Sequence, residues 1–233
     1  MPATMTKQKL LSHLLGTLKK QYDPASEPDR PVLDHLIYAL LRENASRKSA
    51  DRAFRNLCER FFDWNEVRVS SAHEVANALV DLPQPVAKAQ RVVGLLQEVF
   101  EANYSFDLDG LPKKGVKPAA RQIARYQASS DFAVAWVTLK ALDGHAVPLD
   151  DPAMRTLKRL GVVEQHEDNL ATAQASLEHH IPKLKAPLFV ELLNGLSHDR
   201  CTDTPRCNGC PLKSDCNHAA TKPAENGRRP KPR

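Results

Sequence analysis

Four of the five cysteines of this 233-residue chain stand within 16 residues of one another near the C-terminus. They are Cys201, Cys207, Cys210 and Cys216, in a C-x5-C-x2-C-x5-C pattern. A short loop of this composition buries little apolar surface, so an inorganic centre bonded to all four thiolates is the natural source of its order. The spacing therefore predicts a metal centre within residues 200–217.

Two kinds of centre suit four thiolates, a [4Fe–4S] cluster and a Zn²⁺ ion. Zinc ribbons usually present two C-x2-C knuckles, whereas this run has a single one between two arms of five residues. The spacing favours the [4Fe–4S] cluster and leaves Zn²⁺ as the alternative. Disulfides are disfavoured, because residues 1–9 lack the apolar core of a signal peptide and so indicate the reducing cytoplasm. The fifth cysteine, Cys58, is predicted to be a buried apolar side chain.

The rest of the chain predicts an all-α protein. Seventeen prolines and nine glycines punctuate it, and few segments alternate as strands do. No apolar run approaches the roughly 18 residues that span a bilayer, so we expect a soluble protein without membrane contact. Apolar spacing predicts helices near residues 10–18, 31–41, 48–62, 71–79, 85–103, 117–125, 130–142, 152–160, 169–179 and 184–196.

The net charge of +5 is unevenly distributed along the chain. Residues 220–233 carry +4 of it and contain no bulky apolar side chain, so residues 219–233 are predicted to form a disordered basic tail. Any nucleic-acid surface on the body must therefore come from local arrangement. Lys117, Arg121 and Arg125 recur every four residues and would share one helix face, either as a solvated stripe or as a phosphate-binding one.

Two acids precede a proline at Leu149-Asp150-Asp151-Pro152. We predict Asp151 as the N-cap of the helix that follows. Asp150 would then stand one residue outside the helix, with its carboxylate free to point into a cleft. A second acid at such a position is ordinarily explained by the helix dipole alone.

These features together resemble the endonuclease III family of helix-hairpin-helix DNA glycosylases. Pro31–Ser46 resembles the family's early helix and the loop that fills the gap left by an extruded base. Val86–Ala89 resembles the turn into its fourth helix, and Leu149-Asp150 with Met154-Arg155 resembles its aspartate segment. The cysteine run is the most specific element, although the family commonly has one more residue between the first two ligands.

The resemblance implies a two-domain fold with double-stranded DNA, damaged or mismatched, in the cleft between the domains. Residues 31–143 would form a six-helix barrel with a degenerate hairpin, and residues 6–30 with 144–218 the cluster-bearing domain. Asp150 would be the catalytic carboxylate, and Asn44 would reach into the duplex where the family often has glutamine. The cluster would be structural and would present Arg200, Arg206 and Lys213 to the DNA backbone. We expect a cytoplasmic monomer, associated with the nucleoid in a bacterium.

The chain also departs from the family's pattern. Bifunctional members carry a lysine about five helical turns before the aspartate, and 18 residues before Asp150 stands Phe132. A rival alignment uses Leu111–Lys117 as the hairpin and Lys117 as the nucleophile. It leaves 33 residues between Lys117 and Asp150 and requires an inserted helix, so loop length favours Phe132.

With Phe132 in that place, the hairpin is Gln127-Ala128-Ser129-Ser130-Asp131, which lacks the usual glycines. Ser129 and Ser130 are then the candidates for contact with a DNA phosphate. Three interpretations stay open. The chain is a monofunctional glycosylase that uses Asp150 and water, a DNA-binding relative without catalysis, or a glycosylase and AP lyase that uses Lys117.

Overall fold

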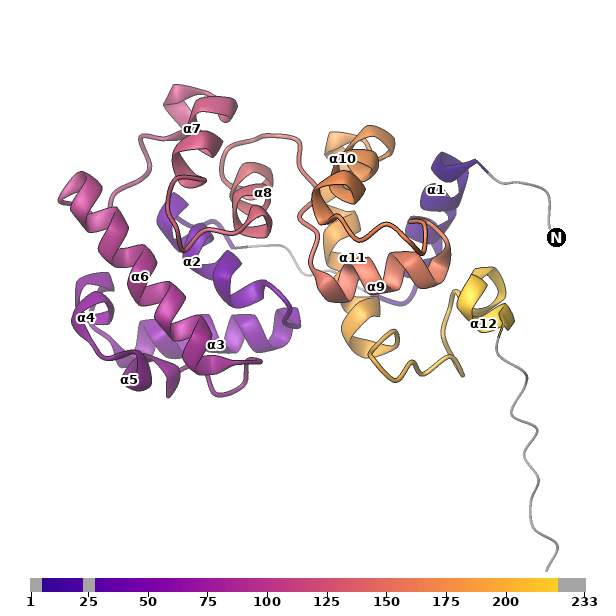
Figure 1. Ribbon diagram of the computed structural model, residues 1–233, viewed down its shortest axis with the longest axis horizontal. Coiled ribbons are helices and arrows are strands. Elements are labelled where there is room, and N and C mark those ends of the chain that lie inside the picture. The colour runs from indigo at the N-terminus through magenta and orange to yellow at the C-terminus, as the bar shows by residue number, and fades with distance from the viewer. Residues whose placement is uncertain (1–5, 23–27, 222–233) are drawn as a thin grey trace, which may run out of the picture.

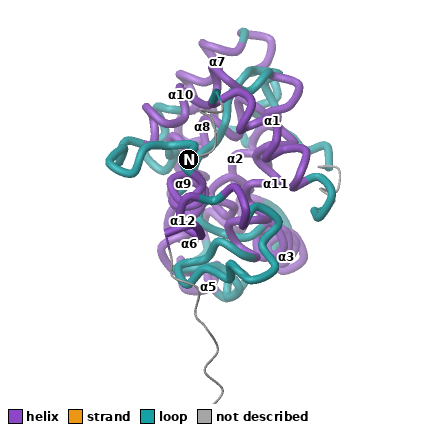
Figure 2. Tube along the Cα trace, turned by 90° about the vertical axis from the view of Figure 1, so that its right-hand side faces the viewer, coloured by secondary structure: helices purple, strands orange, loops and turns teal. Residues whose placement is uncertain are grey.

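The computed structural model describes residues 6–22 and 28–221, and the regular secondary structure within these ranges is entirely helical. Within the described residues there is no β-strand (Figure 2). The predicted all-α class is therefore confirmed. The helices form two lobes side by side, with α2 to α8 in one and α1 with α9 to α12 in the other (Figure 1). We call these the barrel lobe and the C-terminal lobe.

The barrel lobe is built around α2, a helix in which ten of eleven side chains are buried. Residues 31–143, all of them described, hold seven α-helices where six were predicted. The additional helix is α4, which begins because the side chain of Asp63 accepts a hydrogen bond from the N–H of Glu66. The predicted cap at Ser71 is confirmed, since its hydroxyl accepts from the N–H of Glu74. The bounds are α2 Val32–Arg42, α3 Arg47–Arg60, α4 Trp64–Val69, α5 Ala72–Ala76, α6 Pro85–Asn103, η1 Pro112–Lys114, α7 Val116–Ile123 and α8 Asp131–Lys140.

The C-terminal lobe combines the two ends of the chain. Helix α1 packs on α10 and α11, which places the N-terminal segment beside residues more than 150 positions later. The bounds are α1 Lys7–Leu18, α9 Asp151–Leu160, α10 Leu170–His180, η2 Lys183–Lys185, α11 Ala186–Asp199, η3 Lys213–Asp215 and α12 Asn217–Thr221. Residues 219–221 belong to α12, so the predicted start of the tail at residue 219 is too early. The remainder of that tail, 222–233, lies outside the described residues.

The two lobes meet where α11 contacts α3 and α8. Glu191 of α11 lies there against Arg42, which is almost fully buried, with 3.3 Å between the guanidinium nitrogen and the carboxylate oxygen. Arg47 and Lys140 approach the same carboxylate at 3.5 and 3.7 Å. Because a buried charge is costly unless it is paired, this network fixes how the lobes sit on each other.

No helix among the described residues is long and apolar enough to cross a membrane.

Candidate catalytic cavity and cysteine cluster

A cavity of about 190 Å³ lies where the lobes meet. Four segments line it: the α2–α3 loop, the start of α8, the start of α9 and one side of α10. Their residues that bear on chemistry are Glu43, Asn44, Ser130, Asp131, Phe132, Asp150 and Asp151. Residues more than 100 positions apart therefore face one cavity.

Asp150 supplies the buried carboxylate of this cavity. It is the N-cap of α9, and its Oδ1 accepts from the N–H of Ala153 at 3.0 Å. The predicted cap, Asp151, is instead the first helical residue, so that prediction was wrong. Sequence alone does not decide between two adjacent acids, because either one can cap the helix.

The second oxygen of Asp150 is also engaged. Oδ2 accepts from the main-chain N–H of Asn44 at 3.0 Å. The side chain is only 5% exposed. Burial raises the pKa of Asp150, while the N–H groups of Ala153 and Asn44 and the nearby charge of Arg42 act in the opposite direction. The carboxylate is thus held in one orientation by two N–H donors.

The side chain of Asn44 makes a second hydrogen bond to the same segment. Its Oδ1 accepts from the N–H of Asp151 at 3.1 Å. Asn44 has φ +59°, in the left-handed region that asparagine tolerates better than most residues. The predicted wedge residue is therefore bonded to the start of α9 in this structure.

Two cations of α6 hold the loop that carries Asn44. Lys88 is buried, and its Nζ donates to the carbonyl oxygens of Leu40 and Glu43, each at 2.7 Å. Burial lowers the pKa of Lys88 to about 8. Arg91 pairs with the Glu43 carboxylate at 2.6 Å. Sequence reasoning missed both residues, since nothing in the pattern of α6 marks them as different from surface cations.

Phe132 and Lys117 occupy different surroundings. Phe132 lines the cavity with Asp150 and stacks on Trp136, with ring centroids 6.0 Å apart. Lys117 is exposed on α7 and is not among the residues that line the cavity. Of the two residues, Phe132 is the one that lines the cavity with Asp150.

The hairpin joins α7 to α8 through residues 124–130. The hydroxyl of Ser130 caps α8 by accepting from the N–H of Ala133. The hydroxyl of Ser129 is buried and has no hydrogen-bond partner among the described residues. Helix α7 ends at Ile123, so the predicted shared face of Lys117, Arg121 and Arg125 is wrong for Arg125, which lies in the turn beyond.

The four cysteines of the C-terminal run line one pocket. Arg159, Arg200, Arg206, Lys213 and His218 line it as well. Burial raises the pKa of the Cys210 and Cys216 thiols. Among the described residues, no three His, Cys, Asp or Glu side chains are placed to hold one metal ion together. Cys58 is exposed, so its predicted burial was wrong.

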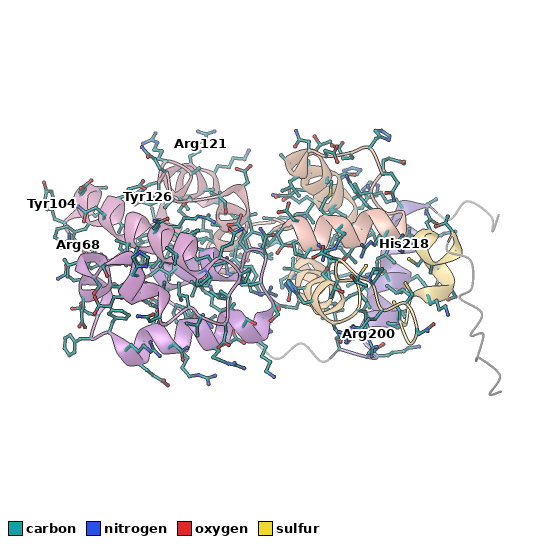
Figure 3. All side chains as sticks on the ribbon, turned by 60° about the horizontal axis from the view of Figure 1, so that its bottom comes forward. Arg68, Tyr104, Arg121, Tyr126, Arg200 and His218 are labelled. Carbon is teal, nitrogen blue, oxygen red and sulfur yellow. The ribbon has the colours of Figure 1, made fainter. Side chains whose placement is uncertain are left out.

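The predicted DNA-binding cations do not gather in one patch. Figure 3 shows Arg121 on the barrel lobe and Arg200 on the C-terminal lobe. Arg200 pairs with Asp199 at 3.1 Å, and Arg206 donates to the carbonyl oxygen of the same residue. Lys213 contacts the side-chain oxygen of Asn208 at 3.3 Å. Asp199 therefore neutralises part of the charge that these cations would present to DNA.

Comparison with solved structures identifies the arrangement of the helices. A non-covalent endonuclease III–DNA complex superimposes with a TM-score of 0.72 at 18% identity, covering 93% of this chain and 98% of that one. A thermostable thymine-DNA glycosylase gives a TM-score of 0.65 at 17% identity, with 92% and 97% covered. The chain has the endonuclease III fold. The predicted resemblance to the endonuclease III family is confirmed at the level of the fold, whereas the predicted domain bounds stay a prediction.

Sequence comparison finds relatives in plants, one of which is named as a DNA glycosylase. DNA glycosylase/AP lyase ROS1 of Arabidopsis thaliana is 23% identical over 229 residues, which covers 91% of this chain and 16% of that protein. DEMETER-like protein 3 of Arabidopsis thaliana is 24% identical over 176 residues, covering 68% of this chain and 17% of that protein. The chain thus spans about a sixth of the length of these relatives. No protein-family model matches it.

Proposed function

We propose that this chain is a DNA N-glycosylase that releases a damaged or mismatched base from double-stranded DNA with Asp150 and water. One observation carries the proposal: a buried carboxylate, held by two N–H donors, faces a cavity between the two lobes of the endonuclease III fold. The similarity to DNA glycosylases in both comparisons supports the same reaction class. We propose that the protein acts as a monomer.

The chemistry follows from the position of the carboxylate. A glycosidic carbon is inaccessible within a base stack, so the nucleotide must leave the duplex before it reaches the cavity. As the base departs, the sugar gains oxocarbenium character, and a fixed negative charge nearby stabilises it. Asp150 would supply that charge and orient the attacking water. Its two N–H contacts keep the carboxylate in place without reorganisation during the reaction.

The proposed reaction is hydrolysis without a covalent intermediate. A Schiff base with the sugar requires an amine in reach of it, and the cavity offers Phe132 at the position that the family's lysine would take. Lys117 does not line the cavity, which argues against the AP-lyase alternative. Borohydride trapping with abasic DNA should therefore give no adduct.

We further propose a [4Fe–4S] cluster as the centre that the cysteine run binds, with Zn²⁺ as the alternative. Cys201, Cys207, Cys210 and Cys216 line one pocket, and the cations around it suit a centre whose thiolates carry net negative charge. Such a cluster supplies folding energy to residues 200–217 and takes no part in the proposed hydrolysis. Iron and sulfide analysis of anaerobically purified protein tests the choice, since zinc without iron would decide for the alternative.

The decisive experiment measures base release from a panel of damaged and mismatched duplexes. Wild-type protein should release at least one base, and Asp150→Asn should slow release by about a hundredfold or more while duplex affinity stays within about threefold. Asp151→Asn, next to it in the same helix, should retain release. Base release by Asp150→Asn at the wild-type rate would overturn the proposal.

A second function has an observation of its own. The hairpin lacks glycine and carries Asp131 at the start of α8, which weakens its contact with a DNA phosphate. These departures from the hairpin of the catalytic family leave a second candidate, a DNA-binding relative without catalysis. Tight binding of a lesion-containing duplex with no base released from any member of the panel would select it.

A further inference from the structure

The hairpin already holds an anion, and that anion belongs to the protein. Glu98, in the middle of α6, points its carboxylate at two successive main-chain N–H groups of the hairpin. The N–H of Gln127 donates to Oε2 at 2.6 Å, and the N–H of Ala128 donates to Oε1 at 3.2 Å. Two consecutive N–H groups that converge on one anion form a nest, the main-chain arrangement that binds phosphate in many proteins.

We infer that this nest is a phosphate-binding site and that the carboxylate of Glu98 occupies it in this structure. A carboxylate offers two oxygens to the pair of donors, as a phosphate group does, so both anions meet the nest in the same way. The inference rests on the proposed DNA binding, because the phosphate in question belongs to the DNA backbone. A phosphate can enter only when Glu98 leaves, which makes Glu98 an autoinhibitory residue of the hairpin.

The neighbouring contacts show why the carboxylate stays in place. Arg91, two turns earlier on α6, donates to the carbonyl oxygen of Ala128 at 3.1 Å and pairs with Glu43 beside the cavity. Helix α6 thus holds the hairpin through Glu98 and Arg91 and the α2–α3 loop through Arg91 and Lys88. An anion tethered so closely has a high effective concentration at the nest and outcompetes free phosphate.

The duplex test compares Glu98→Ala with Glu101→Ala. Glu101 lies on the same helix and contacts Gln97, so its replacement removes an equal charge from α6. Binding to a duplex with a tetrahydrofuran abasic analogue is measured between about 50 and 200 mM salt, the range in which phosphate contacts weaken most visibly. Glu98→Ala should bind about threefold to tenfold more tightly than Glu101→Ala, with a log–log salt slope steeper by about 0.9. Equal or weaker binding by Glu98→Ala would overturn the inference.

A second measurement separates the nest from the proposed function. Inorganic phosphate is titrated into each variant while the amide resonances of Gln127 and Ala128 are followed by NMR. Saturable shifts in Glu98→Ala and none in wild type would support the nest even if no duplex binds, whereas no shift in either would refute it. If Glu98→Ala fails to fold, Glu98→Gln replaces it in both experiments, because it keeps one acceptor oxygen while losing the charge, and its expected changes are smaller in the same direction.

Discussion

Asn44 is hydrogen-bonded to Asp150 beside the cavity although 106 positions separate the two residues in the sequence. The N–H of Asn44 donates to Oδ2 of Asp150 at 3.0 Å, and the Oδ1 of Asn44 accepts from the N–H of Asp151 at 3.1 Å. The first contact needs only the main chain of Asn44 in its left-handed conformation, and the second needs its side chain. The α2–α3 loop therefore positions the candidate catalytic carboxylate.

Substitution of Asn44 distinguishes this positioning role from a wedge role. Asn44→Gly tolerates φ +59° and keeps the N–H that contacts Asp150, so base release should fall by less than about threefold. Asn44→Ala strains the loop by about 1–2 kcal/mol and should reduce release by about tenfold. Single-turnover rates with a saturating duplex provide the measurement. Equal losses in both variants, with weakened duplex binding, would instead indicate a side chain that inserts into DNA.

The raised pKa of Asp150 predicts the pH dependence of base release. Release requires the ionised carboxylate, so its rate should fall in acid along a limb with a midpoint above 3.8, the ordinary value for aspartate. Asp151→Asn should leave that limb in place. A single-turnover rate profile measures it, and a midpoint at or below 3.8 would argue against Asp150 as the group that titrates.

The raised pKa of Asp150 also makes the free energy of unfolding depend on pH. Because the folded state holds the proton of Asp150 more tightly than the unfolded state does, its contribution to the free energy of unfolding is largest below pH 3.8 and is lost as the pH rises through the folded-state pKa. The difference in free energy of unfolding between wild type and Asp150→Asn should therefore be more favourable to wild type near about pH 4 than near about pH 7. Urea unfolding of both proteins at the two values checks it.

Phe132→Lys should introduce covalent chemistry into the cavity. Phe132 faces the space that Asp150 borders, so a lysine there would carry its amine to a sugar held for Asp150. We expect borohydride trapping with abasic DNA to change from no adduct to a clear one. Val134→Lys, on another face of α8, is the matched control and should give none. Trapping by wild type that is lost in Lys117→Ala would show instead that Lys117 is the nucleophile. Because Phe132→Lys removes a ring that stacks on Trp136, thermal melts should show that both lysine variants are folded.

The sequence predicts the helices better than it predicts the site. The bounds of α6 follow directly from its apolar spacing and its first proline, because a long helix repeats one signal many times. The start of α9 is one residue wrong because two adjacent acids are chemically equivalent as caps. Arg125 leaves its expected face because α7 ends early, and periodicity does not record where a helix ends at a hairpin.

Other parts of the site have no local signal at all. Lys88, Arg91 and Glu98 matter because of what their side chains reach in other segments, 29 to 48 positions away. Their spacing places them along one helix, as it would for surface charges that contact only solvent. Such long-range pairs become visible only once the loops they hold have been placed.

Removal of one cysteine ligand should release the metal centre. Cys207→Ser deprives the proposed cluster of a thiolate, so iron should fall from about four atoms per chain to well below that, and proteolysis should cut residues 200–217 sooner. Cys58→Ser removes the exposed fifth cysteine and should keep both the iron and the protection. Iron analysis and limited proteolysis on anaerobic protein measure the two effects. Loss of iron in Cys58→Ser, with iron retained in Cys207→Ser, would contradict the assignment of the ligands.

Glu191→Ala should be the most destabilising of these substitutions, because it leaves buried cations without their partner. The carboxylate lies 3.3 Å from Arg42, whose side chain is 1% exposed, and within 4 Å of Arg47 and Lys140. Breaking a buried pair on one side typically costs about 3–5 kcal/mol, since the remaining charge is stranded away from water. Urea unfolding of the intact protein should show this loss, while replacement of the exposed Glu101 of α6 by Ala stays within about 0.5 kcal/mol of wild type. A loss below about 1 kcal/mol for Glu191→Ala would mean that water reaches Arg42 and that the network does not fix the two lobes.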